Sequence, residues 1–245
     1  MRFHYPEAVR KVVAHLENTQ AEAIERAAQL VVGSLTANGA VFCSDIGHGI
    51  QGDFLNRAGG LAALQPLTFG LSVTDPVARC RAERPRPEPV NREIETVRVA
   101  LRTGNLRAGD VVVAGSVSGR NVRPVELALV CRDLGIRTIG LTSLTYTARV
   151  EPLHPSGLRL CDVADVVVDI GAPYGDAAVD LPGLDVTVMP VSGIGFAVAG
   201  WMIWERVMTM MVDAGKPPTV FMSVNREGGQ QYYERARERF NELGY

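Results

Sequence analysis

Lysine is nearly absent from this chain of 245 residues, which holds only Lys11 and Lys216 among a combined 25 lysines and arginines. Phosphate binding by a P-loop requires a lysine in the pattern G-x-x-x-x-G-K-[ST], and the chain contains no such pattern. Catalysis through a lysine Schiff base would have to use Lys11, in a predicted helix, or Lys216, directly before two prolines. Both chemistries are therefore disfavoured.

Cysteine and histidine are also sparse, and their spacing shows no metal-binding pattern. There are four of each, with no C-x-x-C and no pair of histidines at i, i+4; the histidines are His4, His15, His48 and His154. A zinc site is disfavoured on these spacings, and we expect neither a metal nor another bound cofactor. Cys43 and Cys131 lie in apolar segments, which predicts small, reduced side chains in the core.

Long apolar runs and an excess of basic charge are missing as well. The most apolar stretch, 194–204, is too short to span a bilayer, and the N-terminus lacks the apolar region of a signal peptide. The net charge is −2, from 27 acidic and 25 basic residues, whereas nucleic-acid binding favours clustered positive charge. We therefore expect a cytoplasmic protein with neither a nucleic-acid nor a membrane partner.

What the chain does contain is an alternation of apolar strands and helices. Helical spacing predicts one or two helices over 7–37, a helix that ends near residue 56, and later helices at about 92–103, 122–134, 193–212 and 230–243. Val- and Ile-rich runs predict strands at 39–44, within 64–73, and at 110–116, 136–143, 164–170 and 184–190. Strands of this kind separated by helices are typical of a parallel sheet covered on both faces. We expect one α/β domain over 1–245, a three-layer α-β-α sandwich with helical segments at about 1–37 and 226–245.

A literal G-x-G-x-x-G occupies residues 47–52, directly after the first predicted strand. In dinucleotide-binding turns this pattern is followed, about 20 residues later, by an acidic residue that closes the second strand. Asp75 is the only candidate, and it precedes Pro76 at the start of a proline- and arginine-rich segment, 76–91, which we predict to be an irregular loop. A dinucleotide oxidoreductase is therefore the least favoured function.

A stronger anion-binding signal lies at residues 116–121, Ser-Val-Ser-Gly-Arg-Asn, between a predicted strand and a predicted helix. Hydroxyl groups of Ser116 and Ser118, N–H groups around Gly119 and the helix N-terminus together form an anion cradle. Asn121 is placed to cap the helix or to bind a ligand oxygen. The next strand ends in Thr142-Ser143, and the ends of parallel strands lie side by side. Such hydroxyl groups suit a phosphate monoester.

These residues carry a resemblance to a known family. The segments GSVSGRNVRPVELALVCRDLG, IRTIGLTS and ADVVVD resemble the sugar isomerase (SIS) domain, whose signature is S-x-S-G-x-T before a helix and a later strand ending in I-T-S. A stand-alone branch of SIS proteins is also similar in RAGGL, SGRNVRPVE, TSL, HPSG, GDA and PPTVFMSVNREGG, which follow in the same order over nearly the whole chain. The resemblance implies a flavodoxin-like fold with a mainly parallel five-stranded sheet, a phosphosugar ligand, and self-association as a homodimer or homotetramer.

The resemblance carries over to individual positions. Ser116, Ser118, Gly119 and Arg120 match the phosphate loop, Asn121 stands where many relatives have Thr, and Ser143 matches the strand-end serine. The first glycine loop lacks the hydroxyl residue that follows the glycines in relatives, so we interpret Gly47 and Gly49 as backbone that lets a sugar lie close to the sheet. Asn225, in the sequence NREGG, is expected to reach a site formed between subunits.

Sugar isomerases of this fold commonly move protons with a carboxylate soon after the first loop and a histidine elsewhere. The matching candidates are Asp53, with Glu126 and Glu93 as alternative bases, and His48 or His154 for ring opening. Each has a structural alternative: Asp53 at a helix N-terminus, Glu126 on a solvated helix face, His154 packed in a loop.

Three functions remain open. The first is a phosphosugar isomerase that works through an enediol, the second a lyase or etherase that uses the same enolisation, and the third a phosphosugar-sensing regulator without catalysis. The arginine-rich loop, with Arg79, Arg81, Arg84 and Arg86, is either a solvated surface or a lid over an anionic sugar.

Overall fold

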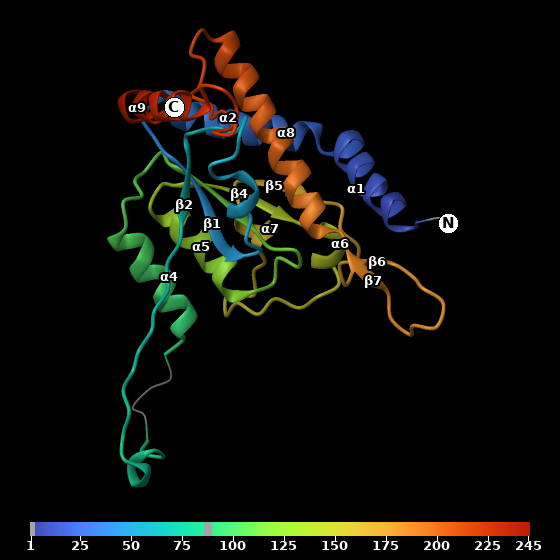
Figure 1. Cartoon of the computed structure of the whole chain (residues 1–245). Coiled ribbons are helices and arrows are strands. Elements are labelled where there is room, and N and C mark those ends of the chain that lie inside the picture. Colours follow the sequence, from blue (N-terminus) through green and yellow to red (C-terminus); the bar gives the residue numbers. More distant parts are fainter. Residues whose placement is uncertain (1–2, 86–89) are drawn as a thin grey trace.

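The computed structural model, which describes residues 3–85 and 90–245, is built on a parallel sheet of five strands in the order β2-β1-β3-β4-β5 (Figure 1). The strands are β1 (Val41–Gly47), β2 (Leu64–Leu67), β3 (Val111–Gly115), β4 (Arg137–Thr142) and β5 (Val166–Asp169). All neighbouring pairs are parallel. Their Val and Ile runs are buried from both sides, which confirms the predicted α/β sandwich.

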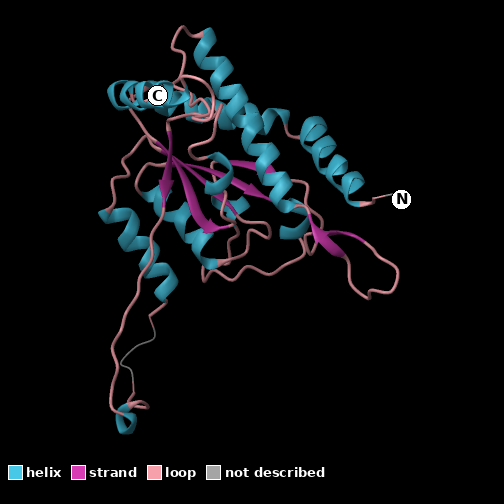
Figure 2. Ribbon diagram, viewed as in Figure 1, coloured by secondary structure: helices cyan, strands magenta, loops and turns pink. Residues whose placement is uncertain are grey.

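Helices cover both faces of this sheet (Figure 2). One layer contains α1 (Tyr5–Thr19), α2 (Ala21–Thr36) and α8 (Ser192–Asp213), whose apolar side chains share a core with Val111 and Val113 of β3. The opposite layer contains α4 (Arg92–Thr103) and α5 (Val122–Asp133), which pack on Val112 and Ala114. Because side chains alternate along a strand, β3 contributes to both cores.

Short helices complete the two layers. The predicted helix ending near residue 56 is a single turn, α3 (Gln51–Phe54), and the Phe54 ring lies edge-on against Trp201 and Trp204 of α8. α6 (Leu144–Thr147) follows β4, and α7 (Leu160–Val163) packs against α5. The C-terminal α9 (Gly229–Leu243) lies near the amino end of β2, where Leu61 bridges Val220 in antiparallel pairing.

The predicted strand at 184–190 does not belong to the central sheet. Only β7 (Val188–Pro190) is extended there, and it pairs antiparallel with β6 (Ala177–Val179) in a separate hairpin. The apolar alternation that suggested a core strand is instead on the surface, because Leu184 and Val186 are exposed. Met189, the middle residue of β7, has a positive φ of 66°, which makes the strand irregular.

Two segments project from the body (Figure 1). The first is an arm, residues 70–85, with a single 3-10 turn at Arg79–Arg81 and exposed side chains throughout. It confirms the described part of the predicted irregular loop; Arg86 and the rest of 86–89 lie outside the described residues. The second is the β6–β7 hairpin. None of the helices within the described ranges has the length and apolar character needed to cross a membrane.

Candidate functional site

An open pocket of about 250 Å³ lies at the carboxyl ends of the strands. The strand order reverses between β1 and β3, which is where open α/β sheets bind ligands. The pocket brings together five of the residues predicted from the sequence and four others; its lining is Gly47, His48, Ser116, Val117, Ser118, Asn121, Tyr146, Gly175 and Asp176.

The end of β1 forms one side of this pocket. Gly47 has φ +85°, and a Cβ atom there would collide with the carbonyl oxygen of Gly115, so only glycine lets the two strand ends approach this closely. The next residue, His48, donates its backbone N–H to that same oxygen over 2.8 Å. Its ring stacks on Phe196 of α8 with centroids 4.8 Å apart. Within the described residues the ring nitrogens have no hydrogen-bond partner, so both remain available to a ligand.

Residues 116–121 turn their carbonyl oxygens into the protein. The oxygen of Val117 accepts from the N–H of Ser143 at 2.9 Å, and that of Ser118 accepts from the Thr147 hydroxyl at 3.0 Å. The N–H groups of Val117 and Ser118 have no acceptor in the described part of the chain. The loop therefore presents donors to the pocket, as an anion-binding nest does.

The rest of the loop joins this cradle to α5. Gly119 has φ +64°, and a Cβ atom would lie 3.0 Å from Thr142 Oγ1 and 3.1 Å from Thr147 Oγ1. Arg120 Nε is buried with no hydrogen-bond partner among the described residues. Asn121 precedes α5 but its side chain makes no capping hydrogen bond, so its amide and the helix N-terminus are both free for an anion.

Two of the four lining residues that were not predicted, Tyr146 and Asp176, carry polar side chains. Tyr146 is in α6, after β4, and its ring meets Tyr174 edge-on at 5.0 Å. Asp176 follows β5 and accepts hydrogen bonds from the N–H groups of Val191 and Ser192. The reasoning that found Ser116 at the end of β3 applies equally after β5, where an aspartate directly after a glycine in GAPYGDA was the available signal.

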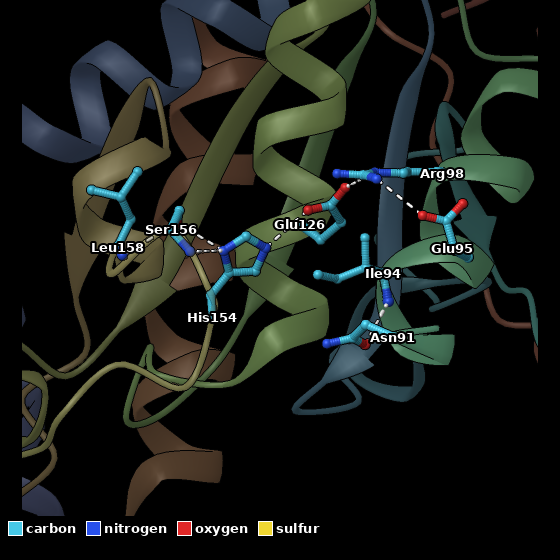
Figure 3. Close-up of polar contacts among 8 residues, drawn as sticks. All are labelled: Asn91, Ile94, Glu95, Arg98, Glu126, His154, Ser156 and Leu158. Carbon is cyan, nitrogen blue, oxygen red and sulfur yellow. Dashed lines mark hydrogen bonds and ion pairs between the residues drawn. The ribbon is translucent and has the colours of Figure 1, made fainter. Parts of the chain in front are cut away.

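Glu126 and His154 are together, but in the interior and not among the residues that line the pocket (Figure 3). His154 Nε2 is 2.9 Å from Glu126 Oε2, and the two side chains are only 6% and 3% exposed. His154 Nδ1 accepts from the Ser156 N–H at 3.1 Å, so the ring proton is on Nε2 and is donated to Glu126. Arg98 Nε donates to the other carboxylate oxygen at 2.6 Å, and this contact raises the pKa of Arg98 above its usual value.

The remaining predicted residues lie elsewhere. Asp53 is half-exposed on α3, 3.9 Å from Arg57, and Glu93 is exposed on α4 beside the root of the arm. Ser143 is buried, donates to the carbonyl oxygen of Ala172 at 2.5 Å and caps α6. Gly49 is exposed next to the pocket, and Asn225 is exposed in the segment before α9. None of these five lines the pocket.

Comparison with known proteins gives consistent matches. A family model described as the SIS domain matches residues 4–143. A UPF0309 protein of Halalkalibacterium halodurans is 32% identical over 242 residues, covering 97% of this chain and 96% of the relative. Two solved structures share the fold. One is a Bacteroides fragilis protein named as a candidate phosphosugar isomerase involved in capsule formation (TM-score 0.52, 19% identity, 94% of each chain). The other is the phosphoheptose isomerase GmhA from Neisseria gonorrhoeae (TM-score 0.50, 18% identity, 82% of this chain and 92% of that one).

Proposed function

This chain belongs to the SIS domain family, and on that premise we propose that it binds a phosphorylated sugar or amino sugar and isomerises it between aldose and ketose forms. The observation that carries the proposal is the loop at 116–121. It presents unpaired N–H groups, two serine hydroxyls and the N-terminus of α5 to a single pocket. A phosphate monoester is the ligand group that this set of donors fits.

The phosphate is placed at Ser116, Ser118 and Asn121, with Gly119 allowing close approach of the backbone. The Arg120 guanidinium is positively charged and belongs to the same loop, but Arg120 does not line the pocket, and its Nε is buried without a partner among the described residues. Gly47 leaves room for the sugar to extend from the phosphate toward His48 along the ends of β1 and β3. Glu126 and His154, predicted as catalytic residues, lie behind the loop, where they support it rather than meet the sugar.

Isomerisation through an enediol needs an acid or base for the sugar oxygens and a base for the carbon-bound proton. His48 lines the pocket, and its ring nitrogens have no partner among the described residues. A histidine exchanges protons near neutral pH, so we assign ring opening and proton transfer between the oxygens to His48. The solved structures of similar fold that carry isomerase names support this choice of reaction over the lyase and sensor alternatives.

The test is thermal unfolding of the chain with a panel of pentose, hexose and heptose phosphates and amino-sugar phosphates, followed by calorimetric titration of the most stabilising compound. Ser118→Ala should weaken binding about 10-fold, because one hydrogen bond to a charged group is lost. Sugars without phosphate should not bind. Equal binding by phosphorylated and unphosphorylated sugars would contradict the proposal. Aldose–ketose conversion of the bound sugar supports the isomerase, proton exchange without conversion indicates a lyase, and binding without exchange indicates a sensor.

Self-association as a homodimer or homotetramer is part of the same proposal. Both projecting segments expose large apolar side chains: Leu71, Val73 and Val77 on the arm, and Leu184, Val186 and Met189 on the hairpin. Large apolar side chains that gather on an exposed segment can form an interaction surface. A second copy of the chain that covers them would remove apolar area from water.

A further inference from the structure

Among the described residues that line the pocket, Asp176 is the only one with a carboxylate. Asp53, Glu93 and Glu126, the carboxylates singled out from the sequence, do not reach it. Asp176 is half-buried and directly follows Gly175 in the segment after β5. A base that takes a proton from a sugar carbon must be within reach of the bound sugar, and within the described chain the pocket offers this one carboxylate.

Hydrogen bonds from α8 hold this carboxylate firmly. Asp176 Oδ1 accepts from the N–H of Ser192 at 2.8 Å and from the N–H of Val191 at 3.2 Å, and Oδ2 accepts from the Ser192 hydroxyl at 2.6 Å. These bonds join the two ends of the β6–β7 hairpin. They also fix Asp176 at φ +66°, a left-handed conformation that few residues other than Gly, Asn and Asp adopt.

The sheet order sets Asp176 and His48 on opposite sides of the anion loop. His48 follows β1, the loop follows β3, Tyr146 follows β4, and Asp176 follows β5, in the spatial order β1-β3-β4-β5. His48 and Asp176 line the same pocket as the anion loop, so a sugar whose phosphate is on that loop has both groups within the pocket. Two separate groups are then available, one for the carbon-bound proton and one for the oxygen-bound protons.

We propose that Asp176 is the general base that moves the proton between C1 and C2 of the sugar, an inference that rests on the proposed isomerisation. The Asp176 carboxylate takes the C2 proton of the open-chain aldose, the C1=C2 bond forms, and the carbonyl oxygen on C1 receives a proton from His48. His48 then takes the proton of the C2 hydroxyl, the C2=O bond forms, and Asp176 returns its proton to C1. The atoms and charge balance without a cofactor or co-reactant.

Asp176 also caps α8, so the test must separate its charge from its capping role. Asp176→Asn keeps an oxygen that accepts the N–H bonds, and asparagine tolerates the left-handed conformation. Ser192→Ala does the converse: it removes the 2.6 Å bond to Oδ2 but keeps the carboxylate. Asp133→Asn, at the exposed end of α5 away from the pocket, is the matched control for loss of an aspartate charge.

The experiment measures exchange of the hydrogen at C2 with deuterated water, for a mixture of pentose, hexose and heptose aldose phosphates. Calorimetric titration then measures the affinity for the sugar phosphate in the mixture that binds most tightly. Asp176→Asn should exchange at least about 100-fold more slowly than the unmodified chain. It should bind the phosphosugar as tightly or more tightly, because a negative charge near the phosphate is gone. Ser192→Ala should lower the melting temperature and keep most of the exchange, and Asp133→Asn should match the unmodified chain.

Two outcomes overturn the proposal in different ways. Exchange that survives in Asp176→Asn and is lost in Asp53→Asn would move the base to α3 and leave the isomerase function standing. No exchange in the unmodified chain, despite phosphosugar binding, would remove the isomerase function and this inference with it.

Discussion

His154 donates its Nε2–H to Glu126 across 2.9 Å in the protein interior, behind the loop that presents anion-binding groups to the pocket. The pair links α5 to the segment 148–160, which also hydrogen-bonds the loop directly: the Leu153 N–H donates to the Arg120 carbonyl oxygen and the Leu160 N–H to that of Gly119. The position of the loop therefore depends on a buried polar contact between residues 28 positions apart in the sequence.

Replacing His154 with alanine should lower the free energy of unfolding by about 1–3 kcal/mol, because a buried carboxylate oxygen loses its donor. It should also weaken phosphosugar binding, since the loop loses part of its support. Glu95→Ala is the matched control. Glu95 bonds the same Arg98 at 3.0 Å but is 48% exposed, so its removal should cost less than about 1 kcal/mol. Urea unfolding measures the free energy of unfolding of both variants. Equal losses would show that the buried His154–Glu126 contact stabilises the fold no more than the exposed Glu95–Arg98 contact.

Gly119→Ala should weaken phosphate binding by the loop at 116–121. The substitution places a side chain in the left-handed region and brings its Cβ to 3.0 Å from Thr142 Oγ1, with a strain of about 1–2 kcal/mol. We expect phosphosugar affinity to fall at least 10-fold in a calorimetric titration. Gly215→Ala carries the same backbone strain at φ +69° with no neighbour within 4 Å and far along the chain from the pocket. It should lose stability but keep affinity; a similar loss of affinity in both variants would contradict the assignment.

The four free cysteines should differ sharply in reactivity. Cys80 is exposed on the arm, whereas Cys43 and Cys131 are buried, which raises the pKa of each to about 12. Alkylation requires the thiolate, so iodoacetamide between pH 7 and 9 should modify Cys80 rapidly and leave Cys43 and Cys131 intact in the folded chain. Peptide mass spectrometry measures the sites. Unfolding in urea should expose all four cysteines. Labelling of Cys43 without urea would mean that the reagent reaches the core around β1 in the folded chain.

Self-association should depend on the hairpin. Val186→Asp puts a charge on a side chain that is 62% exposed in the single chain, and a charge in a buried interface is strongly unfavourable. Sedimentation velocity should show the unmodified chain as a dimer or tetramer and Val186→Asp shifted toward the monomer. Val99→Asp, a 59% exposed valine on α4, should not change the assembly. A monomeric unmodified chain would rule out the proposed oligomer.

Local patterns were enough to predict most of the fold. Helix α4 begins and ends at the predicted residues, because Asn91 caps its first turn and Gly104 follows its last. The valine run of β3 and the helical spacing of α8 also predicted these two elements. The prediction of a core strand at 184–190 was wrong. Alternation of apolar residues shows which side chains lie on the same face of a strand, but it does not show whether that face packs against a core. Here it meets solvent, in a hairpin outside the sheet.

The candidate site was only partly predictable. Ser116, Ser118 and Asn121 were found because strand ends converge in a parallel sheet and their positions follow from strand boundaries. Asp53 was placed by its distance along the chain, but the direction of a side chain on a single helical turn depends on how α3 packs against α8. Asp176 is aimed by its bonds to Val191 and Ser192, 15 and 16 residues away, and no local pattern encodes those.

The most direct test of the central claim is a crystal structure of the chain with the phosphosugar that stabilises it most. The account predicts phosphate oxygens about 2.5–3.2 Å from the hydroxyl groups of Ser116 or Ser118 and from the loop N–H groups, with the sugar between His48 and Asp176. A phosphate bound instead at Arg92 and Arg123, in the separate pocket at the root of the arm, would contradict it.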